Sequence, residues 1–145
     1  MKDPGAAIRN AIFLACDGVV LHLGQPVPIY DGNADLSAPD QYIVLGSQTC
    51  NQNGDKQTFI TYNTIIVHVV TRFDLTDRGN TLFADNIATQ ITQIVNPDPV
   101  TQLDLGPDFQ LVVTNVEGSD TRRYADARHR FVEKAIRFQL IVNQH

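Results

Sequence analysis

The amino-acid sequence predicts an α+β fold, in which an antiparallel or mixed β-sheet carries two packed α-helices. Two segments, about Pro4–Asp17 and Thr81–Val95, show the apolar spacing of amphipathic helices. Two others, Gln57–Phe73 and Phe131–Val142, alternate between two faces and are rich in β-branched and aromatic residues. The length of 145 residues is typical of one domain, so we expect residues 1–145 to form a single domain.

The first helix is expected at about Pro4–Asp17. Asp3 can cap its first turn, Pro4 suits the first helical position, and Gly18 is a good terminator. The apolar residues that fall at positions i, i+3, i+4 and i+7 are Ile8, Ala11, Ile12 and Ala15. This stripe is predicted to face the core.

Two short apolar runs follow the first helix. Val19–Leu23 and Val27–Tyr30 flank a glycine-containing turn, which is typical of a hairpin. Pro26 and Pro28 cannot donate to a strand ladder, so the second strand must be short or lie at an edge. The next segment, Asp31–Asp40, has the composition of a loop.

A longer hairpin is predicted to form the centre of the sheet. Tyr42–Leu45 is strand-like, Gly46–Lys56 is polar and rich in turn residues, and Gln57–Phe73 is the strongest strand in the sequence. The middle of this last strand, Ile65–Val70, is apolar on both faces apart from His68. We therefore expect a central strand covered on both sides, by a helix or by a neighbouring subunit.

The C-terminal part is predicted to add three strands after the second helix. Val100–Leu105 and Phe109–Glu117 are strand-like, and Gly118–Arg128 has the composition of a polar, arginine-rich connection. The last strand is expected from Glu133 onward. A helix over Tyr124–Ile136 is the competing interpretation.

No combination of residues indicates catalysis, a metal site or a cofactor site. The four histidines are scattered, no Cys or His pair has metal-ligand spacing, and no glycine-rich phosphate loop is present. Cys16 and Cys50 are expected to be free thiols, the first buried and the second in a loop. No apolar stretch approaches the ~20 residues of a membrane-spanning helix. We expect no enzyme, cofactor or membrane partner.

Charge is distributed unevenly along the chain. The net charge of −5 argues against sequence-independent capture of nucleic acid, yet Ser119–Arg137 holds six of the eleven basic residues. Acidic residues are interleaved with them, which favours a solvated surface or contacts between subunits over a track for phosphates. A polarised subunit suits head-to-tail pairing with a copy of itself. The candidate interface residues are Arg72, Asp74, Arg122, Arg123, Arg128 and Arg130.

The order of elements resembles the tail-terminator and tail-completion (minor tail) proteins of tailed bacteriophages. The resemblance covers nearly the whole chain and includes VPIYDG (Val27–Gly32), YIVLGSQT (Tyr42–Thr49), TIIVHVVTRF (Thr64–Phe73), ADNIATQITQIV (Ala84–Val95) and EKAIRFQLIV (Glu133–Val142). It implies a structural virion protein at the head–tail joint that is assembled in the cytoplasm of a bacterial host. There it would form a hexameric ring that caps the tail tube, with the tail tube protein and neck or connector proteins as partners and DNA as passing cargo.

The resemblance supplies no catalytic residues. The polar loops are the expected docking surfaces, with Asp31, Asp35, Asn53 and Asp55 as candidate contact residues. One alternative is a neck, stopper or other connector ring protein. An alternative from another class is a small hydrolase or ligand-binding domain that uses His68 or Asp31.

Overall fold

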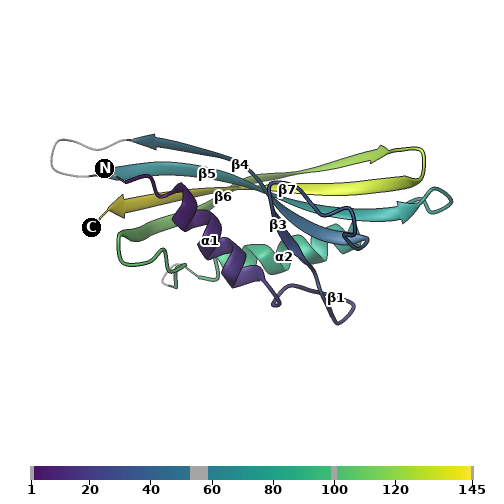
Figure 1. Cartoon of the computed structure of the whole chain (residues 1–145), viewed down its shortest axis with the longest axis horizontal. Helices are drawn as coiled ribbons and strands as arrows, with labels where there is room; N and C mark the ends of the chain where they lie inside the picture. The colour runs from purple at the N-terminus through teal and green to yellow at the C-terminus, as the bar shows by residue number, and fades with distance from the viewer. Residues whose placement is uncertain (1, 53–58, 99–100, 145) are drawn as a thin grey trace.

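The computed structural model describes residues 2–52, 59–98 and 101–144 of the chain. It confirms the predicted α+β fold: within these residues lie two helices, a two-stranded ribbon and a mixed five-stranded sheet (Figure 1). The ribbon pairs β1 (Leu21–His22) with β2 (Gln25–Pro26). The sheet contains β3 (Ile29–Asp31), β4 (Gln41–Gln52), β5 (Ile60–Asp74), β6 (Phe109–Ala125) and β7 (His129–Gln144).

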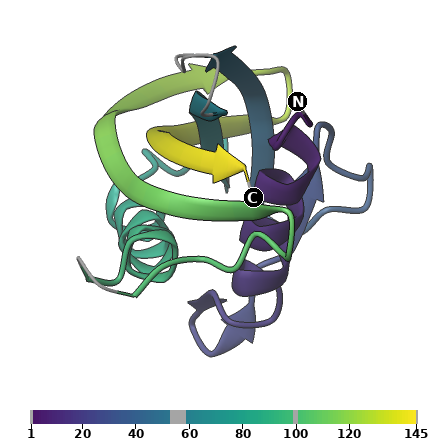
Figure 2. The same ribbon diagram turned by 90° about the vertical axis from the view of Figure 1, so that its left-hand side faces the viewer.

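Both predicted helices are confirmed, as α1 (Gly5–Cys16) and α2 (Leu82–Val95). Helix α1 begins one residue later than expected: Pro4 is its N-cap residue and provides no side-chain cap, while the Asp3 carboxylate accepts the N–H of Gly5 at 2.7 Å just before the helix. A view along the sheet shows both helices on the same side of it (Figure 2). Their fully buried isoleucines, each worth about 1.5–3 kcal/mol when removed from water, are Ile8, Ile12, Ile87 and Ile91.

The strand order is β3-β4-β5-β7-β6, which confirms β5 as the central strand. All neighbouring strands are antiparallel except β3 and β4, which are parallel. One face of β5 and β7 packs against the helices. Its buried side chains are Thr61, Asn63, Ile65, Val67, Val69, Thr71, Val132, Ile136, Phe138, Leu140 and Val142.

No helix among the described residues covers the opposite face of the sheet, where Ile66 and His68 are half-buried. A helix therefore covers β5 on one side only, and cover by a neighbouring subunit on the other side stays a prediction. The apolar middle of β5 predicted that both of its faces are buried, but it did not indicate whether a helix or a neighbouring subunit buries each face. We call this side the open face. Strand alternation and register decide which side chains lie on it. They include Tyr42, Val44, Ile66, His68, Arg122, Tyr124, Phe131, Glu133, Ala135 and Arg137.

The predicted connection at Gly118–Arg128 is instead the end of a long hairpin. Strand β6 continues to Ala125, and β7 begins at His129, which also rules out the helix over Tyr124–Ile136. The Asp126 carboxylate closes the turn by accepting the N–H groups of Arg128 and His129. Polar composition suggested a loop because β6 is an edge strand whose last residues are exposed, so nothing requires apolar side chains there.

Three smaller expectations also need correction. Strand β4 continues from Leu45 to Gln52, with an irregularity in its pairing between Leu45 and Gln48. Most of the predicted polar loop is therefore strand. Cys50 lies on this strand and not in a loop. Asn53 and Asp55 lie outside the described residues. The predicted strand Val100–Leu105 is wrong where it is described: residues 101–105 are irregular, and Leu105 is buried against the core.

The predicted first hairpin forms only in part. Its first run pairs with Gln25–Pro26, which precede the predicted second run, whereas Ile29 and Tyr30 of the second run join the main sheet beside β4. Strand β3 is short and lies at an edge, as the prolines predicted.

Candidate assembly surface

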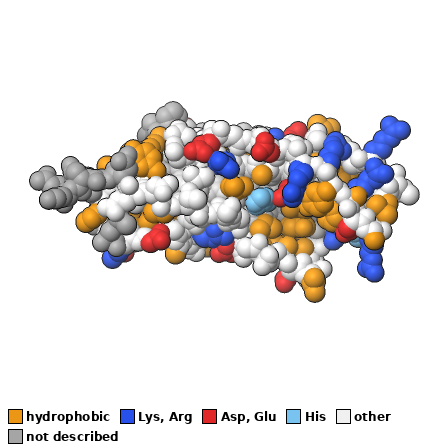
Figure 3. All heavy atoms as spheres, turned by 90° about the horizontal axis from the view of Figure 1, so that it is seen from above, with side chains coloured by type: hydrophobic (Ala, Val, Ile, Leu, Met, Phe, Trp, Pro, Cys, Tyr) orange, Lys and Arg blue, Asp and Glu red, His pale blue; other side chains and the backbone are white. Residues whose placement is uncertain are grey.

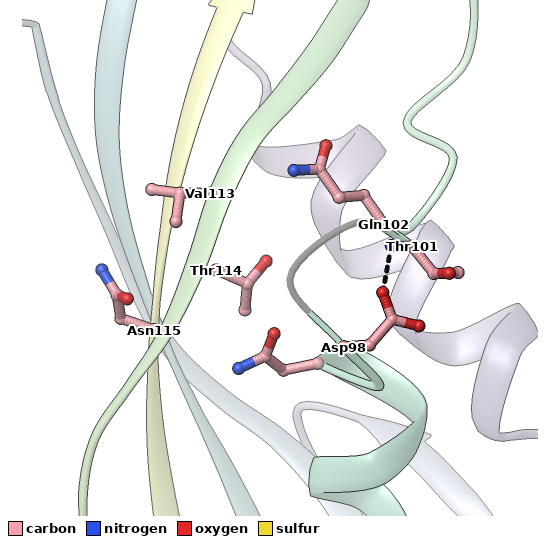
Figure 4. A pocket seen from close by; sticks show the side chains of 7 residues that line it. Asp98, Thr101, Gln102, Val113, Thr114 and Asn115 are labelled. Atoms are coloured by element: carbon pink, nitrogen blue, oxygen red, sulfur yellow. Dashed lines mark hydrogen bonds between the residues drawn. The ribbon is translucent and has the colours of Figure 1, made fainter.

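The pocket next to the end of α2 contains no catalytic constellation. This pocket of about 450 Å³ is lined mainly by amide and hydroxyl side chains from the segment after α2 and from β6 (Figure 4). Its one carboxylate, Asp98, accepts the N–H of Thr101 at 2.6 Å. The other described lining residues carry amide, hydroxyl or aliphatic side chains, so none of them provides a second titratable group.

Residues 2–52, 59–98 and 101–144 contain neither a cluster of metal ligands nor a membrane-spanning helix. No group of three or more His, Cys, Asp or Glu side chains is arranged to hold a metal ion. No helix there has the length and apolar character needed to cross a bilayer.

The open face carries a charged network at its centre. Glu133 of β7 lies between His68 of β5 and Arg122 of β6, with 2.7 Å from His68 Nδ1 to Oε1 and 2.6 Å from Arg122 Nη2 to Oε2. Glu133 is only 8% exposed, so these two partners compensate a carboxylate that water scarcely reaches. The hydrogen bond from Arg122 to Glu133 raises the pKa of Arg122. The network thus fixes three strands to each other on this side.

The geometry of His68 does not favour the hydrolase alternative. A Cβ atom at Gly46 would lie 2.5 Å from His68 Nε2, so the second ring nitrogen packs against the backbone of β4. A catalytic histidine needs that nitrogen to face a substrate or a nucleophile. The other residue of this alternative, Asp31, ends β3 and forms an ion pair with Arg9 of α1, whose Nε lies 2.9 Å away.

Aromatic side chains flank the network on the open face. Tyr124 and Phe131 stack with ring centroids 4.9 Å apart, and the Arg122 guanidinium lies 4.9 Å from the Tyr124 centroid. Burial raises the pKa of Tyr124 and of Tyr42. Viewed onto this face, hydrophobic side chains lie between charged ones (Figure 3). A mixed aromatic and charged face of this kind is typical of surfaces that bind other proteins.

The arginines of the β6–β7 hairpin divide between the two faces because successive strand residues alternate. Arg122 belongs to the network on the open face, whereas Arg123 and Arg130 point to the helix side. There they line a pocket of about 310 Å³ with Arg78, from the segment after β5. Arg128 is exposed in the turn. Basic side chains gather at this end of the molecule (Figure 3).

Two other predicted interface residues lie at the end of β5. Arg72 binds within its own chain, with Nε 3.0 Å from Asp40 Oδ1 and Nη2 3.1 Å from the carbonyl oxygen of Ala38. It therefore holds the loop before β4 against the sheet. Asp74 is exposed. A role for either residue between subunits stays a prediction.

The described part of the predicted docking loops contains one internal contact and one exposed turn. Asp31 is engaged by Arg9, whereas Asp35 is exposed in a turn closed by the N–H of Ala38 on the Asp35 carbonyl at 3.0 Å. Leu36, at the corner of this turn, is fully exposed. Whether Asp31 or Asp35 contacts another protein is untested.

Sequence reasoning missed Glu133 and Arg78. Glu133 was assigned to a strand face and to the acidic residues interleaved with the arginines, but its partnership with His68 depends on the register between β5 and β7. Arg78 lies far from the hairpin in sequence, and only the turn after β5 brings it to Arg123, whose Nη1 lies 3.5 Å from the Arg78 carbonyl. No local signal marks either contact.

Comparison with known proteins identifies a shared fold. A scan against protein-family models and a search of curated protein sequences both find no match. Among solved structures, the chain is similar to one in a structure described as "Virion of native gene transfer agent (GTA) particle". The two chains are 18% identical, the TM-score is 0.67, and the alignment covers 97% of this chain and 99% of the other. The chain therefore has the fold of that virion chain.

Proposed function

We propose that this chain is a structural protein of a phage-like virion and acts by assembly, not by catalysis. The observation that carries the proposal is the fold shared, over nearly the full length of both chains, with a protein of a gene transfer agent virion. The match includes both helices and the whole sheet, so it is not limited to one recurrent motif. The candidate surface consists of a sheet face and the edge strands beside it. Such a surface suits a protein that acts by binding other proteins.

Within the virion, we assign the chain to the head–tail joint, as a ring subunit that ends the tail tube and joins it to the neck. The resemblance to tail-terminator proteins implies a hexamer. Three features of the chain support self-association: β6 is an edge strand with an unpaired outer side, β4 beyond Leu45 has no strand partner outside it among the described residues, and the open face is uncovered. Each of these can bind a neighbouring chain.

A neck, stopper or other connector subunit remains the second candidate. It shares the ring architecture and differs in its position and in the number of copies. The hydrolase alternative has less support, because His68 Nε2 packs on β4 and Asp31 binds Arg9.

DNA enters this proposal only as cargo. The chain carries a net charge of −5, which lowers the affinity of a ring for phosphates that pass through it. The basic hairpin end is then expected to face protein.

The direct test removes the gene from the element that encodes this chain and images the particles by electron microscopy. A terminator gives tails of uneven length that do not join heads, because nothing stops the tube or connects it to the neck. Complementation with the wild-type gene restores tails of uniform length on heads. Loss of DNA-filled heads with normal free tails would instead assign the chain to the neck. Normal particles in normal numbers would contradict the proposal.

A further inference from the structure

The pocket beneath the β6–β7 hairpin combines three guanidinium groups with an apolar lining. Arg78, Arg123 and Arg130 contribute the charges, and Arg123 also donates to the carbonyl oxygens of Arg78 and Gly79. The apolar part consists of Leu75, Tyr124, Ala125, Phe131 and Val132. Among the described residues, none of these arginines forms an ion pair with a carboxylate. We call this site the arginine pocket.

Its chemistry selects a ligand with two parts. Guanidinium groups bind carboxylates through paired hydrogen bonds, and the apolar lining, which includes a Leu75 side chain 42% exposed, favours an aliphatic side chain beside the carboxylate. An acidic residue next to a leucine meets both requirements.

The chain itself presents such a pair at its opposite edge. In the turn Asp35–Ala38, Leu36 is fully exposed and the Asp35 carboxylate is in no ion pair among the described residues. The turn is anchored at its C-terminal end. Ala38 is only 7% exposed, and the Ala38 carbonyl accepts a hydrogen bond from Arg72, so Leu36 projects from an anchored support.

We propose that the arginine pocket receives the Asp35–Leu36 turn of a second copy of this chain. Leu36 packs on the apolar lining while Asp35 binds the guanidinium groups. This contact rests on the proposed function, because it names the pair of surfaces through which the ring subunits associate. It is also more specific than the predicted role of Arg122, which is already engaged by Glu133 within its own chain.

The positions of the two surfaces explain why the contact repeats. The turn connects β3 to β4, at one edge of the sheet, and the pocket lies under β6 and β7, at the other edge. One copy can therefore use its turn and its pocket at the same time. A head-to-tail contact of this kind produces a closed ring when the rotation between neighbours closes.

A nucleic acid phosphate is the competing occupant of three arginines. The mixed lining argues against it, since a phosphate makes no use of the apolar side chains, and the net charge of −5 opposes a polyanion. A second copy supplies both the carboxylate and the leucine.

The test is a charge exchange followed by native mass spectrometry over a range of protein concentrations. We expect Asp35→Arg and Arg130→Asp each to raise the dissociation constant between subunits by at least tenfold, and Leu36→Ser to do the same. An equimolar mixture of the Asp35→Arg and Arg130→Asp proteins recovers assembly when the two variants alternate around the ring. Half of the junctions then contain the native Asp35 and Arg130, and the other half contain the same two charges in exchanged positions. The double variant in one chain also recovers it.

Matched controls lie outside the turn and the arginine pocket. Leu23→Ser changes another leucine that is 83% exposed, and Asp17→Arg reverses another exposed aspartate, so both should assemble as the wild type does. Circular dichroism and thermal unfolding verify that every variant is folded.

The outcomes separate this inference from the proposed function. If the wild type forms rings and the pocket and turn variants form the same rings at the same concentrations, the inferred contact is wrong while the ring stands. If Arg130→Asp weakens binding of an oligonucleotide and leaves the rings intact, the pocket is a phosphate site and the inference is overturned. A wild type that stays monomeric throughout contradicts the ring itself and, with it, this contact.

Discussion

At the scale of single residues, Glu133 connects three neighbouring strands on the open face. Its two oxygens bind His68 and Arg122, which come from the strands on either side of its own. Because Glu133 is 8% exposed, each partner compensates a charge that solvent does little to stabilise. The sequence assigns these three residues to different segments, and only strand register brings them together.

The first prediction concerns this network. We expect Glu133→Ala to lower the free energy of unfolding by about 1–2 kcal/mol, since two charged hydrogen bonds are lost and Arg122 is largely exposed, which limits its share. Chemical denaturation measures the change. Asp120→Ala, which removes an exposed carboxylate on neighbouring β6, should stay within about 0.5 kcal/mol of the wild type. Equal effects of the two substitutions would argue against the network.

A second prediction concerns Cys16. Burial raises the pKa of its thiol from 9.0 to about 11, so the folded chain keeps a proton that the unfolded chain loses above pH 9. Stability is therefore unaffected below pH 9 and falls as the pH rises toward about 11, by at most about 1.4 kcal/mol for each pH unit.

Denaturation at pH 8, 9 and 10 tests the sign of this effect. The Cys16→Ala variant should lose less stability over this range than the wild type, whereas Cys50→Ala, at an exposed position, should behave more like the wild type. Native alkylation should label Cys50 before Cys16. If Cys16 reacts first, or if both variants show the wild-type slope, the buried thiol is not the cause.

At the scale of elements, the periodicity of apolar residues predicted the helices and strands that pack against the core. It did not predict the strand segments that lie outside the core. Helices α1 and α2 were expected within a residue or two of their ends, because the stripes of Ile8 and Ile91 repeat at helical spacing. The central position of β5 followed from its apolar middle. Buried positions carry apolar side chains, so the spacing of these residues in the sequence indicates the type of element.

The ends of β4 and β6 could not be predicted in this way. Gly46–Gln52 and Gly118–Ala125 are polar because the helices do not cover them, and the ladder bonds that make them strands involve only the backbone. The arrangement of the candidate site could not be predicted from the sequence either. Its arginines were found by composition, but their division between the open face and the arginine pocket depends on register and on the turn that carries Arg78.

The third prediction belongs to α2. Ile91 is fully buried against the sheet, so Ile91→Ala should lower the free energy of unfolding by about 2–5 kcal/mol. Leu82 begins the same helix and is 65% exposed, so Leu82→Ala should change stability by less than about 0.5 kcal/mol. Thermal or chemical unfolding compares the two. A large loss at Leu82 together with a small loss at Ile91 would mean that a different face of α2 is buried.

At the scale of the whole molecule, the chain has a helix-covered side and an uncovered side. Both helices lie on one side of the sheet, the opposite side carries aromatic and charged residues, and the edge strand β6 ends in a basic hairpin (Figures 1 and 3). A single chain leaves this surface without a partner. Its fold is that of a chain in a structure described as a gene transfer agent virion.

The most direct test of the assembly proposal is the mass of the purified chain as its concentration rises. The chain has a mass of 16.1 kDa, and native mass spectrometry resolves each number of copies. We predict a single ring species, a hexamer, that gains population with concentration and is lost in Asp35→Arg. A different ring size would favour the connector alternative. A single 16.1 kDa species at every concentration would contradict the proposal that this chain acts by forming a ring.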